Sequence, residues 1–253
     1  HGRLEPGKMF LVNMDEGRII EDEEIKKEIT TKKPYRKWLN KNLVPLSDIN
    51  YTGNLKEVEK ENFEIRLRIF GYTQEDINTI INPMILNAKE AIGSMGTDTP
   101  LAVLSDRPQL LYNYFKQLFA QVTNPPLDGI REEIVTDTSL SIGKDYNIFE
   151  IISNHAKKLK IKNPVISNED LDKIKNIKIK NFKAYSVKAL YNIKEGLNGL
   201  EVSLKKMVSS IERAVKDGSN IIILSDRGVS KTLAPIPVLL ACAHTHNYFK
   251  KSG

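Results

Sequence analysis

The sequence has little cysteine and no long apolar run, and both absences exclude classes of protein. Cys242 is the single cysteine among 253 residues, so no disulfide can form within the chain. No apolar stretch reaches the roughly 18–20 residues that a membrane-spanning helix needs. The first residues, HGRLEPGKMFLVN, lack the basic and then apolar layout of a signal peptide. We therefore expect a cytoplasmic protein without membrane contact. The missing initiator methionine suggests a piece of a longer polypeptide.

The sequence also has no large excess of positive or negative charge. The chain has 38 basic and 32 acidic residues, and the net charge of +6 is too small to indicate nucleic-acid binding. Lysine is concentrated only at 157–183, without the interleaved aromatic side chains on which bases stack. We interpret this stretch as a solvated, partly alternating surface strand. A free-standing anion- or nucleic-acid-binding α/β module is the alternative.

Turn residues and apolar periodicity organise the first part of the chain. Two apolar runs around the turn DEG predict a β-hairpin over 8–20, followed by helices over 21–33 and 34–43. Residues 42–54 contain proline, serine, aspartate and glycine without a sustained period, so they are the best linker candidate. Thr73 with Asp76 three residues on is typical of a capping box. This capping box begins a predicted helix whose apolar face runs to Ala88. Pro83 should kink this helix or divide it in two.

The last third of the chain has the clearest pattern. A strand over 183–190, an amphipathic helix over 200–215, a buried strand over 220–226 and a helix over 234–249 follow one another with short connections. This alternation predicts a parallel α/β arrangement. In such sheets, the loops that leave the carboxyl ends of the strands form the sites.

The tetrapeptide LSDR occurs at 104–107 and again at 224–227, each time after an apolar run. Ser and Asp can satisfy backbone amides where the chain turns, and Arg can pair with Asp. This structural interpretation is favoured over an arginine that grips a phosphate or a carboxylate. The residues after the two copies differ, so the sequence does not indicate a duplicated domain.

Two further motifs contain residue types that can carry chemistry. GSMGTDTP, at 93–100, is rich in small and polar residues but lacks the lysine and the spacing of a phosphate-binding loop, so a tight turn is favoured over an anion cradle. Cys242 and His246 share a helical face, which allows a cysteine hydrolase. A cysteine inside LLACA is more typical of a small core residue. His244 and His246 point to different sides of a helix, so no metal site is expected.

Three stretches carry a resemblance to a known family. EAIGSMGTDTPLAVLSDRPQLLYNYFKQLFAQVTNPPLDGIREE (90–133) and ILSDRGVSKTLAPIPVLLA (223–241) resemble the large chain of glutamate synthase. GRLEPGKMFLVNMDEGRIIEDEEIK (2–26) is similar to the end of that enzyme's glutaminase domain. Three positions depart from the family pattern. The family has a second acidic residue at Thr97, proline at Gly129, and three consecutive histidines in the last helix, where only His246 fits.

The resemblance implies a central domain that connects a glutaminase domain to an FMN-binding synthase domain with an iron–sulfur cluster. The implied fold is an α/β parallel-sheet domain resembling a rudimentary (β/α) barrel, over 47–253, after the tail of a class II glutamine amidotransferase domain over 1–46. An N-terminal β-hairpin and helix extend it, and its last strands are expected to be missing.

The parent enzyme would be an oxidoreductase of nitrogen metabolism that makes glutamate from glutamine and 2-oxoglutarate. This segment alone is expected to be inactive, with no catalytic, cofactor-binding or metal-binding residue. The expected partners are the two flanking domains and, for the parent, a reductase subunit or ferredoxin, with neither nucleic acid nor membrane. The expected contacts to the flanking domains or to an ammonia route are Met95, Thr97, Asp98, Thr99, Ser105, Asp106, Arg107, Ser225, Asp226 and Arg227.

Overall fold

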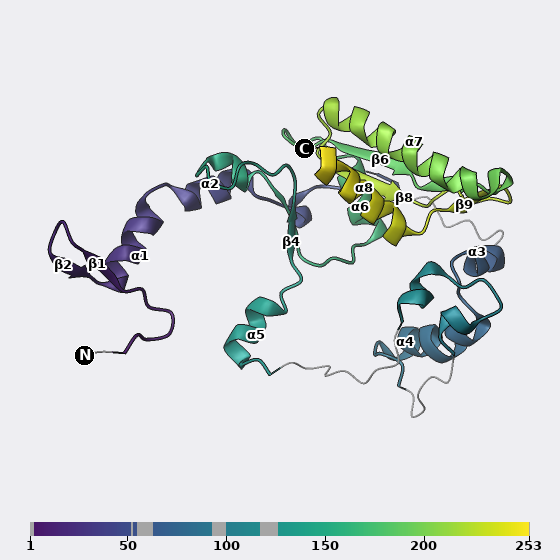
Figure 1. Cartoon of the computed structure of the whole chain (residues 1–253), viewed down its shortest axis with the longest axis horizontal. Coiled ribbons are helices and arrows are strands. Elements are labelled where there is room, and N and C mark those ends of the chain that lie inside the picture. Colours follow the sequence, from purple (N-terminus) through teal and green to yellow (C-terminus); the bar gives the residue numbers. More distant parts are fainter. Residues whose placement is uncertain (1–2, 52, 55–62, 93–99, 117–125, 253) are drawn as a thin grey trace. The chain divides into compact units, whose positions relative to one another are not determined.

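A computed structural model describes residues 3–51, 53–54, 63–92, 100–116 and 126–252 (Figure 1). The chain divides into two compact units. Unit 1 comprises His1–Tyr51, Thr138–Lys173 and Ile179–Phe182, and unit 2 comprises Thr52–Asp137, Ile174–Lys178 and Lys183–Gly253. Among the described residues, no helix is both long and apolar enough to cross a membrane.

Unit 1 begins with the predicted hairpin. β1 (Leu11–Asn13) pairs antiparallel with β2 (Arg18–Ile20), and Gly17 takes the positive φ of 62° that the turn needs. α1 (Asp22–Thr31) and α2 (Tyr35–Asn42) follow, so both predicted helices are confirmed. Three acidic residues occupy the first turn of α1, where they oppose the positive end of the helix dipole.

A three-stranded sheet forms the centre of unit 1. β5 (Leu159–Ile161) lies between β3 (Val44–Pro45), which is parallel to it, and β4 (Leu140–Ile142), which is antiparallel. Leu159 is fully buried and Ile161 nearly so, whereas Lys160 between them is exposed. The sheet therefore joins two segments that lie far apart in the sequence.

The sheet corrects two expectations. Part of the proposed linker, residues 42–54, forms β3 and the 3-10 turn η1 (Leu46–Asp48), in which Leu46 is buried. The lysine-rich stretch is an alternating strand only at β5. Its later part forms the helix α6 (Asn168–Lys175) and then a turn. Ser167 caps this helix, since its hydroxyl oxygen accepts a hydrogen bond from the Asp170 amide.

The first part of unit 2 consists of short helices. These are α3 (Phe63–Ile69), η2 (Asp76–Ile81), α4 (Asn82–Asn87), η3 (Ala102–Leu104), η4 (Leu111–Phe115) and α5 (Gly129–Val135). The predicted capping box is confirmed, since Thr73 and Asp76 bond each other's backbone amides at 2.8 and 3.1 Å. The expected break at Pro83 takes the form of a π-helical segment, η2, directly before it.

The last part of unit 2 is the predicted α/β segment. β6 (Ala184–Lys188) and β8 (Ile221–Ser225) are parallel, and the helix α7 (Gly196–Lys216) lies between them in the chain and packs on β6 (Figure 1). β7 (Leu190–Asn192) pairs antiparallel with β9 (Leu233–Pro235) in a second small sheet. The 3-10 turn η6 (Ile193–Glu195) follows β7, and α8 (Val238–Ser252) follows β9.

The main core lies in this α/β segment. Its buried members are Val187, Ala189, Leu204, Met207, Ile211, Ile236 and Ala241. The α/β class is thus confirmed. The sheets of the described residues hold two or three strands, so the barrel-like arrangement stays a prediction.

Candidate functional site

The two Ser-Asp-Arg turns share one local geometry. The Ser105 hydroxyl oxygen accepts a hydrogen bond from the Arg107 amide at 3.1 Å, and the hydroxyl also lies within donating distance, 3.1 Å, of the Arg107 carbonyl. In the second copy the Ser225 hydroxyl oxygen accepts from the Arg227 amide at 3.4 Å. A serine that bonds the amide two residues on closes a tight turn. The repeated tetrapeptide therefore repeats a turn.

The two turns follow different elements. Ser225 is the last residue of the parallel strand β8, so the second turn leaves the carboxyl end of a strand as predicted. Ser105 follows the 3-10 turn η3, so the first copy is not at a strand end. Asp106, Arg107, Asp226 and Arg227 are all exposed. Both turns therefore present an acidic and a basic side chain on the surface of unit 2.

The other predicted site residues lie outside the described residues. These are Met95, Thr97, Asp98 and Thr99, from the motif GSMGTDTP.

Cys242 differs from its expected position. Its side chain is exposed, whereas the neighbouring Ala241 is fully buried. One residue turns an α-helix by about 100°, so the apolar run LLACA turns the alanine inward and the cysteine outward. His246 is also exposed and His244 is half-buried. Within the described ranges, no group of three or more His, Cys, Asp or Glu side chains could hold a metal ion.

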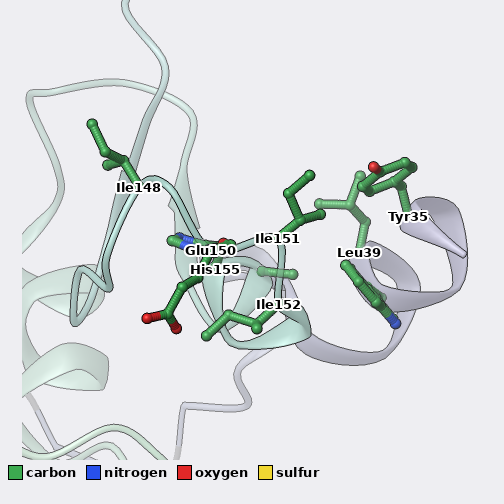
Figure 2. A pocket seen from close by; sticks show the side chains of 9 residues that line it. Tyr35, Leu39, Ile148, Glu150, Ile151, Ile152 and His155 are labelled. Atoms are coloured by element: carbon green, nitrogen blue, oxygen red, sulfur yellow. Dashed lines mark hydrogen bonds between the residues drawn. The ribbon is translucent and has the colours of Figure 1, made fainter. Parts of the chain in front are cut away.

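Unit 1 contains an apolar hollow that no sequence motif indicated. It has a volume of about 420 Å³ and is bounded by α2 and by the segment 148–156, which ends in the 3-10 turn η5 (Ser153–Ala156). Figure 2 shows Tyr35 and Leu39 on one side, with Ile148, Ile151 and Ile152 along the other. The sequence offered one indication, the apolar run in NIFEIIS. A short apolar run does not show that it packs against a helix about 110 residues earlier in the sequence.

The polar side chains that line this hollow, Glu150 and His155, make hydrogen bonds within the same segment. The Glu150 carbonyl lies 2.8 Å from His155 Nε2, and the Glu150 carboxylate accepts from the Asn147 amide group at 3.2 Å. The Tyr146 and His155 rings make an edge contact with centroids 5.9 Å apart. The residues that line the hollow are mostly apolar, and none of them is a cysteine, serine or threonine.

The described residues thus define an α/β chain with exposed polar turns and an apolar hollow, and without a metal-binding group. Comparison with known proteins gives the family. Residues 65–253 match the model of the glutamate synthase central domain, and residues 1–38 match that of class II glutamine amidotransferases. The chain therefore belongs to the glutamate synthase family, and the resemblance read from the sequence is confirmed.

Several relatives are similar to almost the whole chain. "Glutamate synthase [NADPH] large chain" of Bacillus subtilis is 43% identical over 99% of this chain. "Glutamate synthase [NADH]" of Schizosaccharomyces pombe is 38% identical over 98% of it, and "Ferredoxin-dependent glutamate synthase, chloroplastic" of Spinacia oleracea is 36% identical over 100%. The chain spans only 16%, 12% and 16% of the lengths of these relatives, respectively.

Proposed function

We propose that this chain is the connecting segment of a glutamate synthase large chain. It links a glutaminase domain to a synthase domain, and the whole enzyme makes glutamate from glutamine and 2-oxoglutarate. The segment itself performs no bond-making step. Its function is to hold the two reaction centres in register and to help form the route along which ammonia passes between them.

One observation carries this proposal: unit 1 is built from residues of both family matches. α2 overlaps the end of the amidotransferase match and packs against η5, which lies in the central-domain match. The Val44 amide donates to the Lys158 carbonyl at 2.9 Å, next to the fully buried Leu159. A shared core of this kind transmits position, because close-packed interiors deform little. The division into 1–46 and 47–253 and the barrel-like character of the second part belong to the proposal.

The cofactors of the parent enzyme are proposed to lie outside this segment. Thiolates are the usual ligands of iron–sulfur clusters, and Cys242 is the single cysteine of the sequence, so these residues do not fit such a cluster. FMN and the cluster would belong to the synthase part. The three relatives named above carry NADPH, NADH and ferredoxin in their names and yet share this segment. This supports a segment common to enzymes with different electron donors.

The lysine-rich stretch does not favour the nucleic-acid alternative. The Lys158 ammonium group pairs with Asp145 and the Lys173 ammonium group with Glu169 and Asp170. The hydrogen bonds that the Lys173 ammonium group donates to Glu169 and Asp170 raise the pKa of Lys173. The charges of these two lysines are compensated within the chain, whereas a nucleic-acid surface keeps its cations available for phosphate.

The ammonia route is tested at the GSMGTDTP motif. Hydroxyl groups can accept hydrogen bonds from neutral ammonia. We propose that Met95, Thr97, Asp98 and Thr99 lie near the mouth of the route. Thr97→Val and Thr99→Val in the full-length polypeptide should raise the amount of glutamine hydrolysed per glutamate formed. Equal losses in both half-reactions would contradict this role and indicate a folding defect.

The two turns are tested as domain contacts. Arg107→Ala and Arg227→Ala, made in the full-length polypeptide, should lower glutamine-dependent glutamate formation, because each removes a charged surface contact. Asp106 and Asp226 are expected to contribute to the same contacts. If both arginine variants keep the stability and the glutamine-dependent turnover of the unmutated enzyme, the turns are not domain contacts.

A further inference from the structure

The helix α8 lacks a capping side chain of its own. It begins at Val238, and the Ala241 amide donates to the Pro237 carbonyl at 2.9 Å in its first turn. The first amides of a helix have no partner within the helix, and a serine, threonine, asparagine or aspartate before the helix commonly supplies an acceptor. Pro237 has no side-chain acceptor. The Val238 amide can therefore bond only to water or to an acceptor from elsewhere in the chain.

Tyr112 supplies that acceptor from far upstream. Its hydroxyl oxygen accepts a hydrogen bond from the Val238 amide at 3.0 Å. Tyr112 lies in η4, within the stretch 90–133 that carries the family resemblance, and α8 lies at the end of the second such stretch. The Tyr112 phenol group thus bonds one of these segments to the other.

Side-chain contacts connect η4 to the first Ser-Asp-Arg turn. The Asn113 side-chain amide donates to Gln109 at 3.4 Å, and the Gln109 side-chain amide donates to the Ser105 hydroxyl oxygen at 3.1 Å. The Tyr114 hydroxyl oxygen accepts from the Gln109 backbone amide at 3.4 Å. Tyr112 therefore belongs to a small bonded segment that includes this turn.

Backbone contacts connect α8 to the second Ser-Asp-Arg turn. The Ile236 amide donates to the Ala189 carbonyl at 2.8 Å, and the Ala189 amide donates to the Ser225 carbonyl at 2.7 Å. Ile236 and Ala189 are both buried in the main core of unit 2. Ile236, two residues before α8, is therefore bonded through Ala189 to Ser225, and the Tyr112 hydroxyl bonds the start of α8 to the first turn's segment.

We propose that Tyr112 is a positioning residue: its hydroxyl ties the first Ser-Asp-Arg turn to the amino end of α8, and so holds Arg107 and Arg227 in a fixed relation to each other. The part of this proposal that concerns enzyme turnover rests on the proposed function. The contact itself does not.

The contact is tested first by amide hydrogen exchange in the 253-residue chain. Tyr112→Phe removes only the hydroxyl, and it should speed exchange of the Val238 amide by about two- to ten-fold, as expected for one exposed hydrogen bond. Tyr114→Phe is the matched control, since it removes a phenol hydroxyl from the same turn and should leave Val238 unchanged. Equal Val238 exchange in Tyr112→Phe and the unmutated chain would overturn the proposal.

The positioning role is tested by a double-mutant cycle in the full-length polypeptide. Glutamine-dependent glutamate formation is measured for Arg107→Ala, for Arg227→Ala and for their combination, each with and without Tyr112→Phe. The two arginine effects should be non-additive while Tyr112 is present and additive after Tyr112→Phe. Additive effects with Tyr112 present would overturn the positioning role. If neither arginine variant has any effect, the contact role of the turns in the proposed function fails, and the exchange of Val238 still decides the contact.

Discussion

Two regions of unit 2 have similar apolar patterns in sequence and very different burial in the structure. In the α/β segment, residues 183–252, Met207 and Ile211 of α7 are 3% and 1% exposed. In the short-helix region, residues 63–135, Ile85 of α4 and Ile130 of α5 are 72% and 84% exposed. Periodicity predicts a helix in both cases. Burial needs in addition a second apolar surface, and the α/β segment provides one in the cluster of buried residues on which α7 packs.

The difference also changes what stabilises the helices. α7 is 21 residues long and packs on β6 and β7, whereas α4 and α5 have 6 and 7 residues. Isolated helices of that length are marginal in water. The short helices depend more on their ends: the Asp128 carboxylate caps α5 by accepting from the Ile130 and Arg131 amides at 3.1 and 2.9 Å.

The largest expected effect contrasts one isoleucine from each region. Ile211→Ala should lower the free energy of unfolding by about 2–5 kcal/mol, because it leaves a cavity in a packed core. Ile85→Ala, the same change on an exposed helical position, should stay within about 0.5 kcal/mol. Urea unfolding followed by circular dichroism measures both. Similar losses in the two variants would show that the face of α4 is buried as deeply as that of α7.

A smaller effect concerns pH and the capping box. The Thr73 amide and then the Thr73 hydroxyl, which donate to the Asp76 carboxylate at 2.8 and 2.7 Å, lower the pKa of Asp76 below its ordinary 3.8. A lowered pKa in the folded state stabilises the helix at pH values above 3.8. That contribution is lost as the pH falls through the pKa of the folded state.

Amide exchange of residues 76–81 across this acidic range measures the effect. The unmutated chain should lose protection as the pH falls, relative to the intrinsic exchange rate at each pH. Asp76→Asn, whose side chain does not titrate, should show a flat profile. A flat profile in the unmutated chain would mean that the carboxylate does not stabilise the helix.

The smallest effect is expected at the start of α5. Gly129 is its first helical residue, Asp128 before it is extended with ψ of 152°, and a Cβ at Gly129 would meet nothing within 4 Å. Proline is favoured at this position, since its fixed φ suits the helix and its missing amide is not needed. Gly129→Pro should slow exchange in α5 by about two- to five-fold, equivalent to about 0.4–1 kcal/mol. Gly129→Ala keeps the amide and serves as the control; faster exchange in the proline variant would contradict the expectation.

Local patterns were predicted well because they depend on neighbouring residues. The hairpin turn at Gly17, the Thr73–Asp76 capping box and the parallel strands around α7 all follow from short-range spacing. Family membership followed from long, specific stretches of sequence.

What was missed depends on contacts between distant segments. The pairing of β3 with β5 and the hollow beside α2 each need two parts of the chain more than 100 residues apart. Cys242 was expected in the core, but the neighbouring Ala241 is buried instead and Cys242 is exposed. Only packing against the core decides which of the two positions turns inward. The acceptor role of Tyr112 has no local signal either.

Native-state hydrogen exchange of the Val44 amide tests the central claim most directly, because this amide bonds the Lys158 carbonyl and so reports whether the amidotransferase tail and the central domain share one core. The account predicts that Val44 and the amides of β4 and β5 open together, with the same dependence on denaturant. Exchange of Val44 at the rate of an unprotected amide, while β4 and β5 stay protected, would contradict it.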